Sequence, residues 1–191
     1  MKAEKLLEKL GPLFLRFYSK CNLYSAKCNL ELAKLVEITT DEMSVPEKAF
    51  KTSLKIITTA FAEDHPVTGE FYLQYGYFLQ GLERFEEARE QFDKAYSIYK
   101  KAYGAKNPCI ITTRCAIALL ERDRENFDMA SSLLKRSVED GIEYFGEMHC
   151  KVGTIYYWLS VIAASLGKTE DAVNYMHKAI EINRNYLGPN S

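Results

Sequence analysis

Histidine and cysteine are the side chains of this 191-residue chain best suited to metal binding or nucleophilic catalysis. They stand next to each other only at His149-Cys150. A zinc site would need a second such pair at ligand spacing, and the sequence has none. Adjacent side chains on a helix point about 100° apart, which hinders proton transfer between them. We therefore expect no metal, no cofactor and no catalytic residue, and interpret the pair as a helix-start histidine followed by a packed cysteine.

Acidic pairs occur at Glu86-Glu87 and Glu170-Asp171, and two neighbouring carboxylates can serve general acid–base catalysis. Each pair falls where an apolar helical pattern begins, and the helix dipole favours negative charge in a first turn. The sequence contains no glycine-rich phosphate loop, no HExxH and no GxSxG. We therefore predict that the protein is not an enzyme.

The balance of charge and apolarity restricts the partners and the compartment. The 25 Lys and Arg residues are offset by 26 Asp and Glu, so there is no basic excess to bind nucleic acid. No apolar run approaches the roughly 18 residues that would suggest a membrane span. The five cysteines are an odd set without CxxC spacing, and the first residues, MKAEKLLEKL, are too charged for a signal peptide. We predict a cytoplasmic protein without membrane insertion.

The chain repeats itself with a period of 42 residues, which indicates stacked supersecondary units. In this frame one column holds alanine, another an aromatic residue or threonine, and a third holds glycine. The columns are Ala88, Ala130 and Ala172; Phe85, Phe127 and Thr169; Ala95, Ser137 and Ala179; Tyr103, Phe145 and Leu187; Gly104, Gly146 and Gly188; and His65, Asn107 and His149.

Each unit is predicted to be a pair of helices. In the second half of one unit, Phe85, Ala88, Phe92 and Ala95 fall on one helix face, and the next unit repeats the pattern. The glycine that follows suits a helix C-cap, and the proline after it suits the first turn of the next helix. The small residues allow the helices to approach closely. We expect about nine helices and no strand.

The run Glu83-Arg84-Phe85-Glu86-Glu87-Ala88, followed by Ala95, Tyr103-Gly104 and Asn107-Pro108, resembles the tetratricopeptide repeat in its longer form, similar to kinesin light chain repeats. The likeness covers three units, from residue 65 to about residue 188. HEAT arrays have a similar period, but the glycine-then-proline junction favours the tetratricopeptide pattern. The resemblance implies an all-α fold in which antiparallel helix pairs stack into a right-handed superhelix.

The 42-residue frame divides the chain into leading helices at residues 1–21, a degenerate helix pair at residues 22–64, and three repeats at residues 65–191. In the degenerate pair we expect helices at about residues 23–38 and 46–62, because proline is tolerated in a first turn. The last helix carries apolar residues that no later unit covers. We expect that a second copy or a partner covers this end, or that the natural protein continues past residue 191.

In tetratricopeptide arrays the first helices of successive units line a concave groove, so the resemblance identifies the columns that would bind a peptide. In this chain they hold Glu70, Leu73, Tyr77, Thr112, Cys115, Leu119, Arg122, Thr154, Tyr157 and Val161. The centre of this strip is apolar and aromatic, which fits an apolar peptide or a partner helix. Alternatively, the chain's own leading helices cover the strip, or it packs inside a tight superhelix.

Two features depart from the family pattern. Chaperone-binding relatives clamp a terminal carboxylate with an asparagine where this chain has Tyr77, Leu119 and Val161, so we do not expect that ligand. Arg114 and Glu121 fall in columns that normally pack between helices. Either the second unit is rotated relative to our alignment or these two side chains pair with each other.

The function that these observations favour is a non-catalytic adaptor or scaffold that binds a protein segment. Two alternatives remain. The 42-residue units also resemble the C-terminal helical region of SET and MYND lysine methyltransferases, which would make the chain a regulatory domain of a larger enzyme, although no SET or MYND sequence is present. The other alternative is a sensor domain for a peptide or a small molecule.

Overall fold

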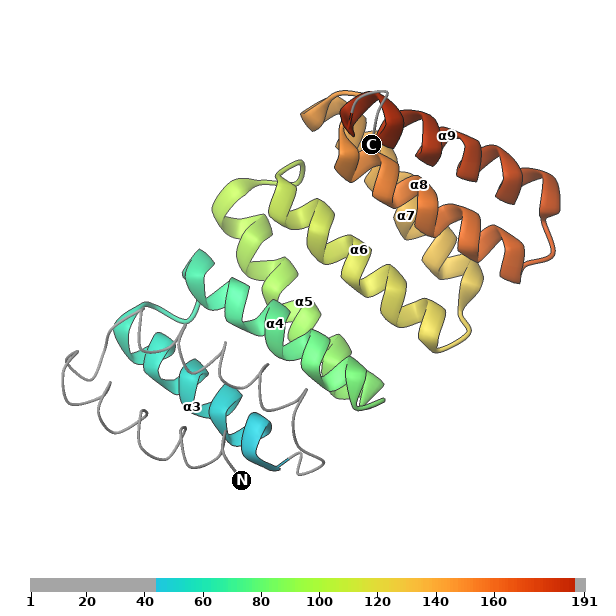
Figure 1. Ribbon diagram of the computed structural model, residues 1–191. Helices are drawn as coiled ribbons and strands as arrows, with labels where there is room; N and C mark the ends of the chain where they lie inside the picture. The colour runs from blue at the N-terminus through green and yellow to red at the C-terminus, as the bar shows by residue number, and fades with distance from the viewer. Residues whose placement is uncertain (1–43, 188–191) are drawn as a thin grey trace. The chain divides into compact units, whose positions relative to one another are not determined.

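The computed structural model describes residues 44–187, which contain seven helices and no strand (Figure 1). The helices are α3 Ser44–Ala60, α4 Pro66–Gly81, α5 Phe85–Tyr103, α6 Pro108–Asp123, α7 Phe127–Phe145, α8 Cys150–Ser165 and α9 Thr169–Leu187. The predicted all-α fold is confirmed. The leading helices predicted at residues 1–21 and the helix predicted at residues 23–38 lie outside the described residues.

The chain divides into two compact units, residues 1–75 and 76–191, with the boundary inside α4. In the first unit, α3 starts and ends two residues before the helix predicted at residues 46–62. Pro46 lies in its first turn, where the missing backbone N–H costs little. Phe50 of α3 stacks on Tyr75 of α4 with ring centroids 5.5 Å apart, and both side chains are buried.

The helix boundaries reproduce the 42-residue period of the sequence. The second helices α5, α7 and α9 begin at Phe85, Phe127 and Thr169, and the first helices α6 and α8 begin at Pro108 and Cys150. Three residues join each first helix to its second helix, and four residues join one repeat to the next. Successive helices from α5 to α9 pack against each other (Figure 1).

Each loop between repeats contains a glycine after the preceding helix and a side chain that caps the next helix. Asn107 Oδ1 accepts a hydrogen bond from the backbone N–H two residues later at 2.9 Å, and His149 Nδ1 accepts the equivalent bond at 3.2 Å. Gly104 and Gly146 have φ angles of 81° and 89° with extended ψ, a region that is open almost only to glycine. These local requirements explain two of the sequence columns.

Replacing His149 by alanine should lower the free energy of unfolding by about 1 kcal/mol, because the first turn of α8 loses its acceptor. His149→Asn keeps an acceptor in the position where Asn107 caps α6, so this variant should remain closer to the parent in urea unfolding. The His149 ring also stacks on Phe145, with centroids 4.8 Å apart. Equal losses in the two variants would show that this stacking, and not the cap, makes the contribution.

The small residues of the repeat lie in the core, as the pattern predicted. Ala88 and Ala130 have no exposed surface, whereas Ala172 in the last helix is half-buried. One apolar cluster joins α6, α7, α8 and α9, and its members include Ile111, Ala118, Leu134, Val138, Val152, Ile155, Tyr156, Leu159, Ile162, Ala179 and Ile182. The last two repeats therefore share a continuous core.

Arg114 and Glu121 are both buried in α6, so the alignment assigned them to the correct columns. The prediction that they pair with each other is wrong, because seven residues on a helix span about 10 Å. Arg114 Nη1 instead donates to Asp140 Oδ2 of α7 at 2.6 Å. Glu121 Oε1 accepts from Arg89 of α5 at 2.6 Å and from Arg124 at 3.2 Å. Each buried charge thus has a partner on another element.

Candidate peptide-binding groove

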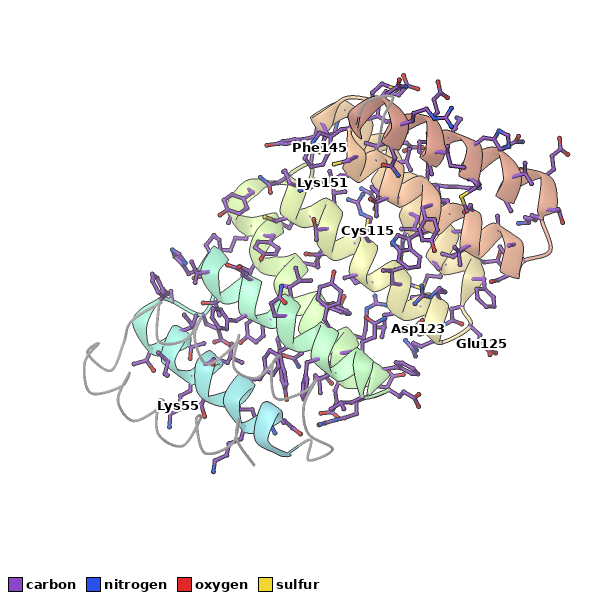
Figure 2. All side chains as sticks on the ribbon, viewed as in Figure 1. Lys55, Cys115, Asp123, Glu125, Phe145 and Lys151 are labelled. Carbon is purple, nitrogen blue, oxygen red and sulfur yellow. The ribbon has the colours of Figure 1, made fainter. Side chains whose placement is uncertain are left out.

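A cavity of about 250 Å³ lies between α6 and α8, and the side chain of Tyr77 from α4 contributes to its wall. Five of the predicted groove residues line it, namely Tyr77, Thr112, Cys115, Leu119 and Thr154. The rest of the lining is Ile111, Ala116, Phe145, Lys151, Ile155 and Trp158. Figure 2 shows Phe145 and Lys151 toward one end of α6 and Asp123 at the other, with Cys115 between them.

Two more predicted residues do not line the cavity themselves but contact Trp158, which does. Tyr157, whose side chain is 42% exposed, packs edge-on against Trp158 with ring centroids 5.0 Å apart. The Arg122 guanidinium lies over the Trp158 ring, 4.9 Å from its centroid, where the ring quadrupole attracts a cation. These contacts hold the tryptophan at the wall of the cavity.

The three remaining predicted residues are not part of this lining. Val161 lies one turn beyond Tyr157 on α8, is half-buried, and lines a different cavity between α8 and α9. Glu70 and Leu73 belong to the first unit, where Glu70 is exposed and Leu73 is buried.

The cavity is mainly apolar, and Lys151 is the only charged side chain among its lining residues. Lys151 Nζ lies 5.0 Å from the centroid of the Phe145 ring. At the far end of α6, Arg122 pairs with Asp123 at 2.6 Å, and Gln80 Nε2 donates to the same carboxylate at 2.6 Å. The charges at that end are therefore paired, while a cation borders the other end.

Burial alters the ionisation of two side chains that face the cavity. It raises the pKa of Tyr77 to about 12, and the neighbouring Cys115 adds to this shift. Burial also raises the pKa of Cys115 to about 11, against the opposing effects of a hydrogen bond with Ser137 and the charge of Arg114. Both groups are neutral at pH 7, so the Cys115 thiol is a weak nucleophile. Such a lining suits apolar contact better than covalent chemistry.

Family models of the tetratricopeptide repeat match residues 67–140 and 153–186, which together make up more than half of the chain. The chain is a tetratricopeptide repeat protein. The matched segments include α4 to α9 in whole or in part. A sequence comparison with curated proteins finds no match.

Solved structures with this tetratricopeptide fold share little sequence with the chain. BtubC from P. vanneervenii has a TM-score of 0.76 and 17% identity over 96% of this chain and 72% of that one. The structure of nearly identical, kinesin-light-chain TPR-like repeats from Podospora anserina has a TM-score of 0.74. Its sequence identity is 14%, over 95% of this chain and 86% of that one. Aspartyl phosphate phosphatase F from Bacillus subtilis has a TM-score of 0.77 and 15% sequence identity. The match covers 95% of this chain but only 45% of that chain. These similarities establish the fold.

Reasoning from the tetratricopeptide columns missed six lining residues, among them Trp158, Phe145 and Lys151. Trp158 directly follows the predicted Tyr157, and it is the single tryptophan of the chain. Its type is a usable signal, because tryptophan is enriched among the residues that dominate binding energy. Phe145 ends α7 and Lys151 lies in the first turn of α8, so their place in the lining depends on how the loop between repeats folds. No spacing in the sequence indicates that.

The His149-Cys150 pair lies at the start of α8, as predicted. His149 Nδ1 is 3.8 Å from the Cys150 sulfur, but the same nitrogen accepts the capping hydrogen bond from the backbone N–H of Lys151. The histidine therefore acts as a cap. Among residues 44–187, no group of three or more His, Cys, Asp or Glu side chains could hold a metal ion. No described helix is both long and apolar enough to cross a membrane.

Proposed function

We propose that this tetratricopeptide repeat protein is a non-catalytic adaptor that holds an apolar segment of a protein partner in the groove formed by α4, α6 and α8. The repeats and their structural relatives support a protein-interaction role in general. The observation that supports this particular site is the cavity that brings Tyr77, Cys115, Leu119 and Trp158 together. The compartment we propose is the cytoplasm, because the sequence has an odd set of five cysteines.

The size of the cavity favours a side chain of a longer ligand over a free small molecule. Its volume of about 250 Å³ is below the roughly 300–1,000 Å³ of typical small-molecule sites. Aromatic and aliphatic walls offer contact area with few rotamers to immobilise, which favours an apolar anchor residue. The peptide on either side of that anchor would lie along the exposed residues Thr112 and Thr154.

Changing Tyr77 and Leu119 together to Glu should weaken peptide binding by about 30-fold or more, because two charges would enter an apolar wall. Peptides selected from a random displayed library on the parent protein provide the ligands, and fluorescence anisotropy measures their affinity. Both positions are partly exposed, so the helical circular-dichroism signal should be unchanged.

The matched control changes Tyr103 and Met129 to Glu. These side chains are 50% and 43% exposed on α5 and α7, and neither lines the cavity. The control should bind the selected peptides like the parent. Binding that survives the Tyr77 and Leu119 changes but is lost in the control would place the site on the second helices and refute this proposal.

A further inference from the structure

The last repeat presents an open valley between α8 and α9, separate from the groove. A cavity of about 580 Å³ lies there, and its walls include Val161 and Ala164 of α8 together with Ala172, Val173 and Met176 of α9. No charged side chain belongs to the lining. Val173, one of these wall residues, is 49% exposed.

The earlier repeats show what normally fills this surface. Met176 corresponds by the 42-residue period to Phe92 and Leu134, both of which are fully buried, whereas Met176 is half-buried. Phe92 packs on Gly76 and Tyr77 of its own repeat. In addition, α6 packs on α5 and α8 packs on α7. The equivalent surface on α9 thus has the shape that receives the first helix of a following repeat.

The helices α6 and α8 share a ridge of four buried residues, which is apolar throughout in α8. In α8 the buried residues Val152, Ile155, Leu159 and Ile162 recur at spacings of three, four and three, and Gly141 of α7 lies against the first two. In α6 the same positions hold Ile110, Thr113, Ile117 and Leu120, all of them buried. This spacing is the seam of two helices that pack side by side.

The residues beside the valley indicate which kind of helix it can bind. Arg89 and Gln80 hold acidic residues of α6, with Arg89 bound to Glu121 and Gln80 bound to Asp123. The corresponding residues of the last repeat are Val173 and Ala164, which are apolar. An incoming helix therefore finds no partner for the acidic residues of α6 and fits best with the uncharged ridge of α8.

We propose that this valley binds an amphipathic helix of a protein partner, with bulky apolar residues spaced like those of α8. A second copy of this chain fits less well. Two such valleys facing each other would place one concave surface against another, with no ridge to fill either. Among the described helices the first-helix ridge of a second copy is already covered, since Phe71, Tyr75 and Phe78 of α4 are buried.

The test uses a designed helix of about 20 residues on an Ala, Glu and Lys background. It carries Val, Ile, Leu and Ile at the spacing of Val152, Ile155, Leu159 and Ile162. The control helix has the same composition with the four apolar residues scattered around its surface. We expect the patterned helix to bind the full chain at least about tenfold more tightly in fluorescence anisotropy.

Val173→Glu together with Ala164→Glu should reduce this binding by about tenfold or more, with unchanged circular dichroism, since both side chains are exposed. The Tyr77 and Leu119 variant should bind the helix normally, which separates this valley from the groove. Equal affinity for both helices, or loss of binding in the groove variant, would overturn the proposal. So would self-association in sedimentation that Val173→Glu removes, because a second copy would then be the occupant.

Discussion

Replacing Asp140 by isoleucine should lower the free energy of unfolding by about 3–5 kcal/mol, because it leaves a buried guanidinium without its counter-charge. Arg114 is 3% exposed, and its Nη1 bonds to Asp140 at 2.6 Å. Its Nη2 is buried without a hydrogen-bond partner among the described residues. The pair is therefore incompletely satisfied even in the parent. Urea unfolding followed by circular dichroism measures the loss.

The matched control adds Arg114→Tyr to Asp140→Ile. The last repeat carries Tyr156 and Ile182 in these two columns, and both belong to the apolar core. The double variant should recover at least the stability of the parent, since well-packed apolar residues often replace a buried ion pair without loss. If Asp140→Ile alone stays within about 1 kcal/mol of the parent, water or local rearrangement solvates Arg114 and this interpretation fails.

The repeat architecture could be predicted from the sequence because its determinants are local. The capping positions at Asn107 and His149 and the glycine at residue 146 each act within a few residues of the chain, and the column of Ala88 and Ala130 recurs with the same period. A fixed period then repeats these local signals, and the helix boundaries follow it. The backbone conformation was less predictable where one column of the repeat holds different residue types. Glu125 adopts φ 63° in the position that Gly167 occupies in the next unit.

The groove was only partly predictable, since its walls depend on contacts between repeats. Tyr77, Cys115 and Leu119 share helix faces that an alignment identifies. Phe145 lines the same cavity because the end of α7 lies beside the start of α8, and no sequence column indicates this. The partners of the buried charges were missed for the same reason. Arg114 bonds to a residue 26 positions away, so pairing within one helix was the wrong model.

Replacing Gly76 by alanine should lower the free energy of unfolding by about 3 kcal/mol, at the upper end of the range for overpacked cores. A Cβ at this position would lie 2.5 Å from Cε1 of Phe92, closer than carbon atoms approach without displacement. The ring cannot move aside cheaply, because Phe92 is fully buried and packs edge-on against Tyr77 with centroids 5.2 Å apart. The helix propensity of alanine recovers less than about 1 kcal/mol of this loss.

The second repeat supplies the compensating change, since its equivalents of Gly76 and Phe92 are Ala118 and Leu134, both fully buried. Adding Phe92→Leu to Gly76→Ala should therefore restore stability to within about 1 kcal/mol of the parent, because volume moves from one helix to the other. Phe92→Leu alone leaves a cavity beside Gly76 and should be less stable than the double variant. Independent, additive losses in the two single variants would show that these side chains do not compete for the same space. The close approach of α4 and α5 at Gly76 would then need another cause.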